Sequence, residues 1–281
     1  MNLVVRGASP WGQPIILHAA WSLLWLCLAG AAAFVVVHAL WAGRRAGAPA
    51  GPVPPELAGA FPGAVARHSF VARVFHWLMA ACVLTLLATA FSPRFGLAFD
   101  WVGPHVLAGA VLVAAIAFHI AHAITCQDVG AIWPVPADWP QLRAVLFPPR
   151  DGAAMPRAGK YPLGNKLFHL GAVVVGLTLA ATGTAMLWRV RTPFVTRDPY
   201  RVFGDGGWGV VYALHGLAAM ALAGLVVIHV YFAIRPEKRP ITRSMLVGTM
   251  DRDFYLGHHD PARWGGEGPA PKEPAKEAGS A

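Results

Sequence analysis

Five long apolar stretches limit what this chain can fold into. They run over residues 15–42, 73–91, 104–125, 167–188 and 210–234, and an α-helix needs about 20 apolar residues to cross a bilayer. Of the 281 residues, 56% are hydrophobic and only 13% are charged, which is too little charge for the surface of a soluble domain of this size. The eleven tryptophans fit aromatic belts at both membrane interfaces. The sequence therefore predicts an all-α membrane protein, a transmembrane helix bundle with five spans.

The first apolar stretch has the charge pattern of a retained helix, not of a cleaved signal peptide. Only Arg6 precedes it, whereas Arg44 and Arg45 follow it, and a signal peptide carries its positive charge on the N-terminal flank. The Pro/Gly/Ala-rich segment 43–66 is typical of a linker. We expect three parts: an extra N-terminal transmembrane helix and linker at 1–65, a core domain at 66–264 and a disordered cytoplasmic tail at 265–281.

The distribution of basic residues predicts the orientation. Five spans place the two termini on opposite sides of the membrane, which we call the N-terminal side and the C-terminal side. Of the 23 lysines and arginines, six fall on the N-terminal side and the other 17 on the C-terminal side. By the positive-inside rule, the C-terminus is cytoplasmic and the N-terminus periplasmic, in the inner membrane of a bacterium.

The net charge and the cysteines exclude several functions at this stage. The net charge of +9 does not indicate nucleic-acid binding, because the basic residues lie in loops between apolar stretches. The three cysteines, Cys27, Cys82 and Cys126, lie far apart, so they form neither a disulfide framework nor a zinc motif. No C-x-x-C-H motif occurs, which excludes covalently attached c-type haem.

Four of the twelve histidines form a pattern across the membrane. His215 and His229 lie 14 residues apart in the fifth stretch, which is roughly 21 Å along a helix and within about 40° of the same face. His76 begins the second stretch, at the depth of His229, and His105 begins the third, at the depth of His215. Each pair offers two imidazoles from different helices, as bis-histidine ligation of a haem b requires. We therefore predict two haem b groups, one near each side. Glycines on or beside these helices would help the rings fit: Gly103, Gly109, Gly183, Gly216 and Gly224.

Other residues are weaker candidates for contact with the haems. His119 and His122 are rival ligands for the haem on the C-terminal side, or belong to a proton path. Haem propionates need cationic partners, so Arg73 is expected near that haem and Arg94, Arg189 and Arg191 near the other; ordinary snorkelling at the interface explains these arginines equally well. Four histidines are expected at interfaces or in solvent: His18, His38, His258 and His259.

Six short sequence motifs are fairly specific when they occur together. They are Arg73-Val-Phe-His76-Trp77, Pro104-His105 followed by Gly109, Gly159-Lys160-Tyr161, His215, His229 within Ile-His-Val-Tyr-Phe, and Gly257-His258-His259-Asp260-Pro261-Ala262-Arg263-Trp264. Here the chain resembles the cytochrome b (gamma) subunit of membrane-bound formate dehydrogenase, in the group that includes the cytochrome b subunits of nickel–iron hydrogenases. The resemblance covers about residues 66–264, which makes this part a dihaem cytochrome b domain. Residues 1–65 are an addition to the family's four-span core.

The resemblance implies site residues and a role. In the family, the histidines that match His76 and His229 bind the cytoplasmic-side haem, and those that match His105 and His215 bind the periplasmic-side haem. The family's quinone site lies near the cytoplasmic haem, so we expect contacts with quinone from Lys160, Tyr161, Asn165, His169 and His229, although His169 fits an interfacial residue equally well. The chain departs from the family's usual residues at Pro162 and Asn165, which leaves the type of quinone open.

The expected function is electron transfer between a periplasmic partner and the quinone pool. The partner would be an iron–sulfur or c-type cytochrome redox subunit, and the catalytic chemistry would lie in another subunit. We expect the loop 189–209, with Phe194, Tyr200, Phe203 and Trp208, to dock the partner or to form an aromatic belt. The loop 133–150, with Trp133 and Trp139, is expected on the membrane surface. The alternatives are a cytochrome b of a hydrogenase or other oxidoreductase, a haem-free membrane anchor, or a transporter with a histidine proton relay.

Overall fold

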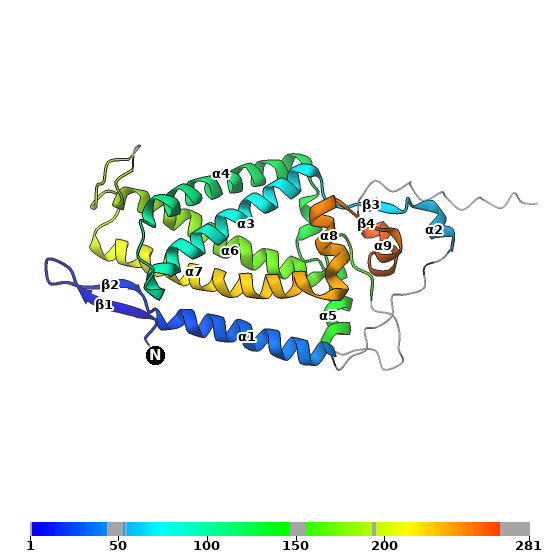
Figure 1. Cartoon of the computed structure of the whole chain (residues 1–281), viewed down its shortest axis with the longest axis horizontal. Coiled ribbons are helices and arrows are strands. Elements are labelled where there is room, and N and C mark those ends of the chain that lie inside the picture. Colours follow the sequence, from blue (N-terminus) through cyan, green and yellow to red (C-terminus); the bar gives the residue numbers. More distant parts are fainter. Residues whose placement is uncertain (1, 44–52, 54, 147–155, 193–194, 265–281) are drawn as a thin grey trace, which may run out of the picture.

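The computed structural model confirms an all-α transmembrane bundle. It describes residues 2–43, 53, 55–146, 156–192 and 195–264. Five helices in this part of the chain are long and apolar enough to cross a membrane, and they lie along the long axis of the molecule (Figure 1). Their bounds are α1 Ser22–Gly43, α3 Phe70–Phe91, α4 Val102–Cys126, α6 Leu163–Met186 and α7 Asp205–Ile234, with short 3₁₀ turns Ser92–Phe95 and Leu187–Arg189 extending α3 and α6.

The chain begins with a β-hairpin that the sequence did not predict. Strands β1 (Val4–Ala8) and β2 (Pro14–Ala19) pair antiparallel, so the helix expected from residue 15 begins only at Ser22. An apolar run alone does not distinguish a strand from a helix. The hairpin packs on the start of α7, where a Cβ atom on Gly209 would lie 1.8 Å from the carbonyl oxygen of Ile16. Only glycine permits this contact.

The N-terminal helix α1 packs along α7. A Cβ atom on Gly216 would lie 3.3 Å from the Cβ of Ala19, and one on Gly224 would lie 3.4 Å from the carbonyl oxygen of Cys27. Both glycines therefore face the N-terminal segment, so the expectation that they make room for a haem was wrong. A buried apolar cluster joins the same elements: Ala19, Ala20, Leu23, Leu24, Phe91 and Met220.

The remaining helices form two closely packed pairs. Helix α3 packs against α4, and α6 packs against α7, whereas the backbones of α3 and α7 have no extensive contact. Side chains from both pairs therefore face the space between them, and this arrangement positions the histidines described below.

A small cap covers the C-terminal side of the bundle, on the right in Figure 1. Strands β3 (Ala64–Ala66) and β4 (Thr249–Asp251) pair antiparallel within it. The expected linker 43–66 thus contains ordered structure, although residues 44–52 and 54 lie outside the described residues, as does the tail 265–281. The other elements of the cap are α2 Pro55–Ala60, η5 Pro236–Lys238, α8 Arg239–Val247, α9 Arg252–His258 and α10 Pro261–Trp264.

His259 is an anchor of this cap, not the solvated residue that the sequence analysis expected. Its side chain is only 1% exposed, and its Nδ1–H donates a 2.7 Å hydrogen bond to the carbonyl oxygen of Gly159. His258, by contrast, is exposed as expected. The bond of His259 ties the C-terminal segment to the loop that precedes α6.

The loop between α4 and α6 is held by a buried carboxylate. It contains η2 (Val129–Ile132), η3 (Pro136–Asp138) and α5 (Trp139–Leu146). Asp138 is 1% exposed and accepts hydrogen bonds from Lys166 at 2.8 Å and Arg263 at 2.7 Å. Trp133 and Trp139 of this loop are exposed.

Candidate metal centres

His76 and His229 meet on the C-terminal side of the bundle. The imidazoles, from α3 and α7, lie 6.2 Å apart between ring centroids at an interplanar angle of 51°. Neither ring forms a hydrogen bond with any residue in the described ranges. Two imidazoles from different helices at this separation would suit a metal ion held between them.

His105 of α4 and His215 of α7 both lie on the N-terminal side, and each is bonded to a threonine of a neighbouring helix. The Nδ1 atom of His105 lies 2.8 Å from the hydroxyl oxygen of Thr89, and the Nδ1 atom of His215 lies 2.8 Å from that of Thr182. The sequence analysis missed both threonines, because a threonine within an apolar helix usually bonds its own backbone and gives no signal in the sequence.

Gly183 lies directly against the ring of His215. A Cβ atom on Gly183 would lie 3.4 Å from the Cε1 atom of His215. Of the five glycines expected near the haems, it is the one that contacts a predicted ligand: Gly103 has open space, and Gly109 faces Leu86. A branched side chain at position 183 would displace the ring.

Arg73 is placed to neutralise an anionic group on the C-terminal side. It lies one turn before His76, and it donates through Nη1 to the carbonyl oxygen of Leu246. Its Nε atom is buried, with no hydrogen-bond partner within the described residues. Two facing imidazoles without partners and an unsatisfied guanidinium nitrogen nearby fit a bis-histidine haem with a propionate on this side.

The arginines of the N-terminal side are engaged elsewhere. Arg189 donates to the hydroxyl of Tyr212 at 2.8 Å and to the carbonyl oxygen of Pro199. The guanidinium of Arg94 lies over the ring of Trp21 at 5.7 Å, and Arg191 is exposed. These contacts fit ordinary interface residues better than partners of a haem propionate.

The other histidines near the bundle have contacts of their own. His119 stacks on Phe75, with ring centroids 4.3 Å apart and an interplanar angle of 6°. His122 bonds the side chain of Gln127 at 3.0 Å, and His38 bonds the hydroxyl of Tyr231 at 2.9 Å. His18, expected at the end of a helix, lies in β2 and bonds the carbonyl oxygen of Ala19.

The residues expected to contact quinone are partly brought together. The ammonium of Lys160 lies 5.8 Å from the ring centroid of Tyr161, in the loop before α6. His169 is partly buried on α6, and Asn165 is exposed on the first turn of that helix. Among the described residues, the side chain of Asn165 forms no hydrogen bond with Lys160, Tyr161 or His169.

Two residues that the sequence analysis did not single out complete this cluster. Arg67 is 4% exposed; its guanidinium lies 5.8 Å from the ring centroid of Tyr161 and donates from Nε to the Nε2 atom of His68. Burial lowers the pKa of Arg67 to about 10. Burial, with the charges of Arg67 and Lys160, lowers the pKa of His68 to about 3. In this cluster Arg67 therefore donates, and the neutral ring of His68 accepts through Nε2.

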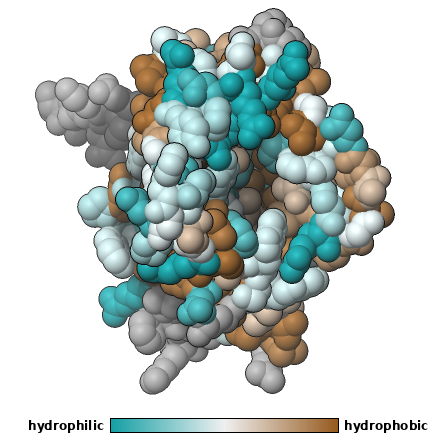
Figure 2. Space-filling view, turned by 90° about the vertical axis from the view of Figure 1, so that its left-hand side faces the viewer, coloured by the Kyte–Doolittle hydropathy of each residue, from teal (hydrophilic) through white to brown (hydrophobic). Residues whose placement is uncertain are grey.

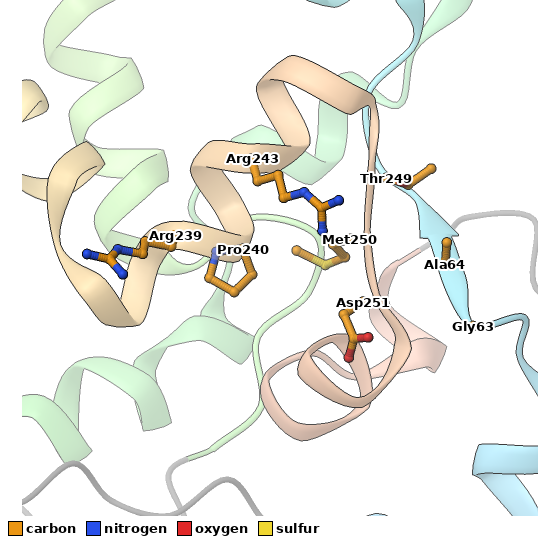
Figure 3. A pocket seen from close by; sticks show the side chains of 8 residues that line it. All are labelled: Gly63, Ala64, Arg239, Pro240, Arg243, Thr249, Met250 and Asp251. Carbon is orange, nitrogen blue, oxygen red and sulfur yellow. The ribbon is translucent and has the colours of Figure 1, made fainter.

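A surface pocket of about 370 Å³ lies in the cap, away from the paired histidines. Figure 3 shows Arg239 and Arg243 extending from α8 in different directions, with Met250 of β4 next to Arg243. None of the predicted site residues lines this pocket.

The loop expected to dock a partner is only partly available for contact. Tyr200 is 61% exposed and Phe203 39% exposed, but Trp208 is 1% exposed beneath Arg189, whose guanidinium lies 5.2 Å from its ring. Phe194 lies outside the described residues. Figure 2 looks onto this end of the molecule and shows hydrophilic and weakly polar side chains spread across it. The expectation for Trp208 was therefore wrong.

A transmembrane helix bundle with histidines paired between its helices defines a membrane cytochrome of the b type. The family model described as prokaryotic cytochrome b561 matches residues 67–248, and the chain belongs to this family. It is thus a multi-pass bacterial membrane protein, an electron-transfer subunit that binds haem b. The comparison with curated proteins found no match.

Proposed function

We propose that the chain is a dihaem cytochrome b. His105 and His215 would hold the haem on the N-terminal side, and His76 and His229 the haem on the C-terminal side, within a domain at 66–264. The observation that carries the proposal is the histidine arrangement of α7. His229 lies beside His76 of α3, and His215, like His105 of α4, is bonded to a buried threonine on the N-terminal side. Ionisable side chains inside a membrane are costly, so four histidines at two depths on facing helices favour a functional role.

The role of each haem follows from the depth of its ligands in the membrane. When bound, each haem would supply a one-electron carrier on its own side of the membrane. His215 and His229, about 21 Å apart along α7, would place these carriers in sequence across the bilayer. Arg73 would hold a propionate on the C-terminal side through its unpaired Nε atom.

The two sides would serve different partners. With the N-terminus periplasmic, as the positive-inside rule favours, an iron–sulfur or c-type cytochrome subunit would exchange electrons on the N-terminal side, as in formate dehydrogenase gamma subunits. Quinone would bind on the C-terminal side, near Lys160, Tyr161, Asn165 and His169. The donors of Lys160 and Tyr161 suit the carbonyl oxygens of a quinone.

The pyridine haemochrome assay tests this proposal on the purified full-length chain. We expect two protohaems per chain and b-type bands in the reduced-minus-oxidised spectrum. One protohaem per chain would reject the dihaem arrangement, and none would reject the whole proposal.

A further inference from the structure

Two threonines hold the histidine pair of the N-terminal side from neighbouring helices. Thr89 of α3 reaches His105 of α4, and Thr182 of α6 reaches His215 of α7, each with an oxygen-to-Nδ1 distance of 2.8 Å. Both threonines are buried. The contacts thus repeat in both of the closely packed helix pairs.

The hydroxyl hydrogens of these threonines are already used. The hydroxyl oxygen of Thr89 lies 2.7 Å from the carbonyl oxygen of Thr85, and that of Thr182 lies 2.6 Å from the carbonyl oxygen of Thr178. A carbonyl oxygen only accepts hydrogen bonds, so each hydroxyl donates its single hydrogen to its own helix. The hydroxyl oxygen can then only accept from the histidine.

This fixes the protonation of both histidines. The Nδ1 atoms of His105 and His215 must carry the hydrogen, because they donate to the threonines, and the lone pair of each neutral ring is therefore on Nε2. A metal-binding histidine usually donates its second ring nitrogen in this way, which orients the ring and raises its basicity. His76 and His229 have no comparable bond among the residues that the structure describes.

We propose that Thr89 and Thr182 are positioning residues that present the Nε2 atoms of His105 and His215 to a haem iron and lower the midpoint potential of that haem. A more basic imidazole stabilises the ferric state, and hydrogen bonding around the ligands is one of the means by which a protein sets a haem potential. The inference rests on the proposed function, since it needs the haem on the N-terminal side.

The test compares Thr89→Val and Thr182→Val with Thr89→Ser and Thr182→Ser in the full-length protein. Redox titration gives the midpoint potential of each haem, and electron paramagnetic resonance of the oxidised protein reports the ligand field of each. We expect the valine variants to raise the potential of one haem and shift its low-spin signal, while the other haem is unchanged. The serine variants should resemble the wild type, because serine keeps the hydroxyl.

Matched controls lie one helical turn away. Thr85 and Thr178 bond only their own helices, to the carbonyl oxygens of Ala81 and Val174, so Thr85→Val and Thr178→Val should leave both haems unchanged. If the valine variants lose one haem, retention of that haem in the serine variants supports the inference. The inference would be overturned if the valine and serine variants shifted the potential equally, or if no variant shifted it. The proposed function would still stand in that case, provided that the wild type binds two protohaems.

Discussion

The ammonium of Lys166 lies 2.8 Å from the carboxylate of Asp138, and both side chains are almost fully buried. Burial alone would raise the pKa of Asp138, but hydrogen bonds from Lys166, the backbone of Val135 and Arg263 outweigh it and lower the pKa below its ordinary value. The carboxylate is therefore charged at neutral pH. It joins three segments that are far apart in the sequence: the loop before α5, the start of α6 and α10.

Replacing Asp138 should strongly destabilise the protein. Asp138→Ala leaves Lys166 as a buried charge without its counter-ion, and removing one partner of a buried pair costs about 3–5 kcal/mol. The measurement is the thermal unfolding midpoint in detergent. Asp253→Ala is the control, because Asp253 forms an exposed ion pair with Arg252 and should cost at most about 1 kcal/mol. The double variant Asp138→Ala/Lys166→Met should recover part of the loss; equal midpoints for the two aspartate variants would contradict the prediction.

Each proposed haem should depend on its own pair of histidines. His76→Ala and His229→Ala should each halve the protohaem content and leave the same remaining haem, because both remove a ligand on the C-terminal side. His105→Ala and His215→Ala should instead leave only the haem on the C-terminal side. Haem content per chain and the α-band of the reduced protein distinguish the two groups.

His122→Ala is the matched control for these variants. His122 is a histidine of the same bundle, but it bonds Gln127 at the end of α4, so its removal should leave both haems. Retention of two haems in His229→Ala would reject His229 as a ligand and direct attention to His119 instead.

Quinone reactivity should depend on the donors on the C-terminal side. Lys160→Ala and His169→Ala each remove a hydrogen-bond donor. The loss of a charged bond from Lys160, about 1.5–3 kcal/mol, corresponds to roughly a tenfold or larger fall in affinity, and the loss of a neutral bond from His169 should have a smaller effect. The rate of haem reduction by a soluble quinol analogue measures this, with haem content checked in the same samples. Arg143→Ala, which removes an exposed cation from α5 on the same side, should retain the wild-type rate. If the Lys160 and His169 variants retain it as well, quinone binds elsewhere.

The five spans were predictable because hydrophobicity over about 20 residues is a local property of the sequence. The meeting of His76 with His229 could also be foreseen, since depth in a membrane follows from position along a helix. The hairpin at residues 4–19 was missed because its second strand is as apolar as the helix that follows it. The cap was missed for a related reason: short elements such as β3 and β4 are defined by a partner distant in the sequence, not by their own pattern.

The contacts around the site were less predictable than the site. The bonds of Thr89 and Thr182 to histidines depend on how neighbouring helices are rotated, which the sequence does not state. The burial of Trp208 likewise depends on Arg189 and on the hairpin that packs beside it. His259 appeared solvated because it follows the last span, yet its position is set by Gly159, 100 residues earlier.

The cap should loosen in acid because of His259. Burial, reinforced by the charge of Arg67 and opposed by the hydrogen bond to Gly159, lowers the pKa of His259 from 6.5 to about 4. The unfolded cap therefore binds a proton that the folded cap excludes, so the stabilisation is complete above pH 6.5 and is lost as the pH falls toward 4. The loss amounts to about 3 kcal/mol at pH 4.

Hydrogen–deuterium exchange of residues 249–264, corrected for the intrinsic effect of pH, measures this loss. Exchange should rise steeply between pH 6.5 and 4 in the wild type. His259→Asn keeps a donor for the carbonyl oxygen of Gly159 but removes the titrating group, so its exchange should vary less with pH. His258→Asn changes the exposed neighbour and should retain the wild-type profile. A wild-type cap whose corrected exchange stays constant down to pH 4 would show that His259 does not control its stability.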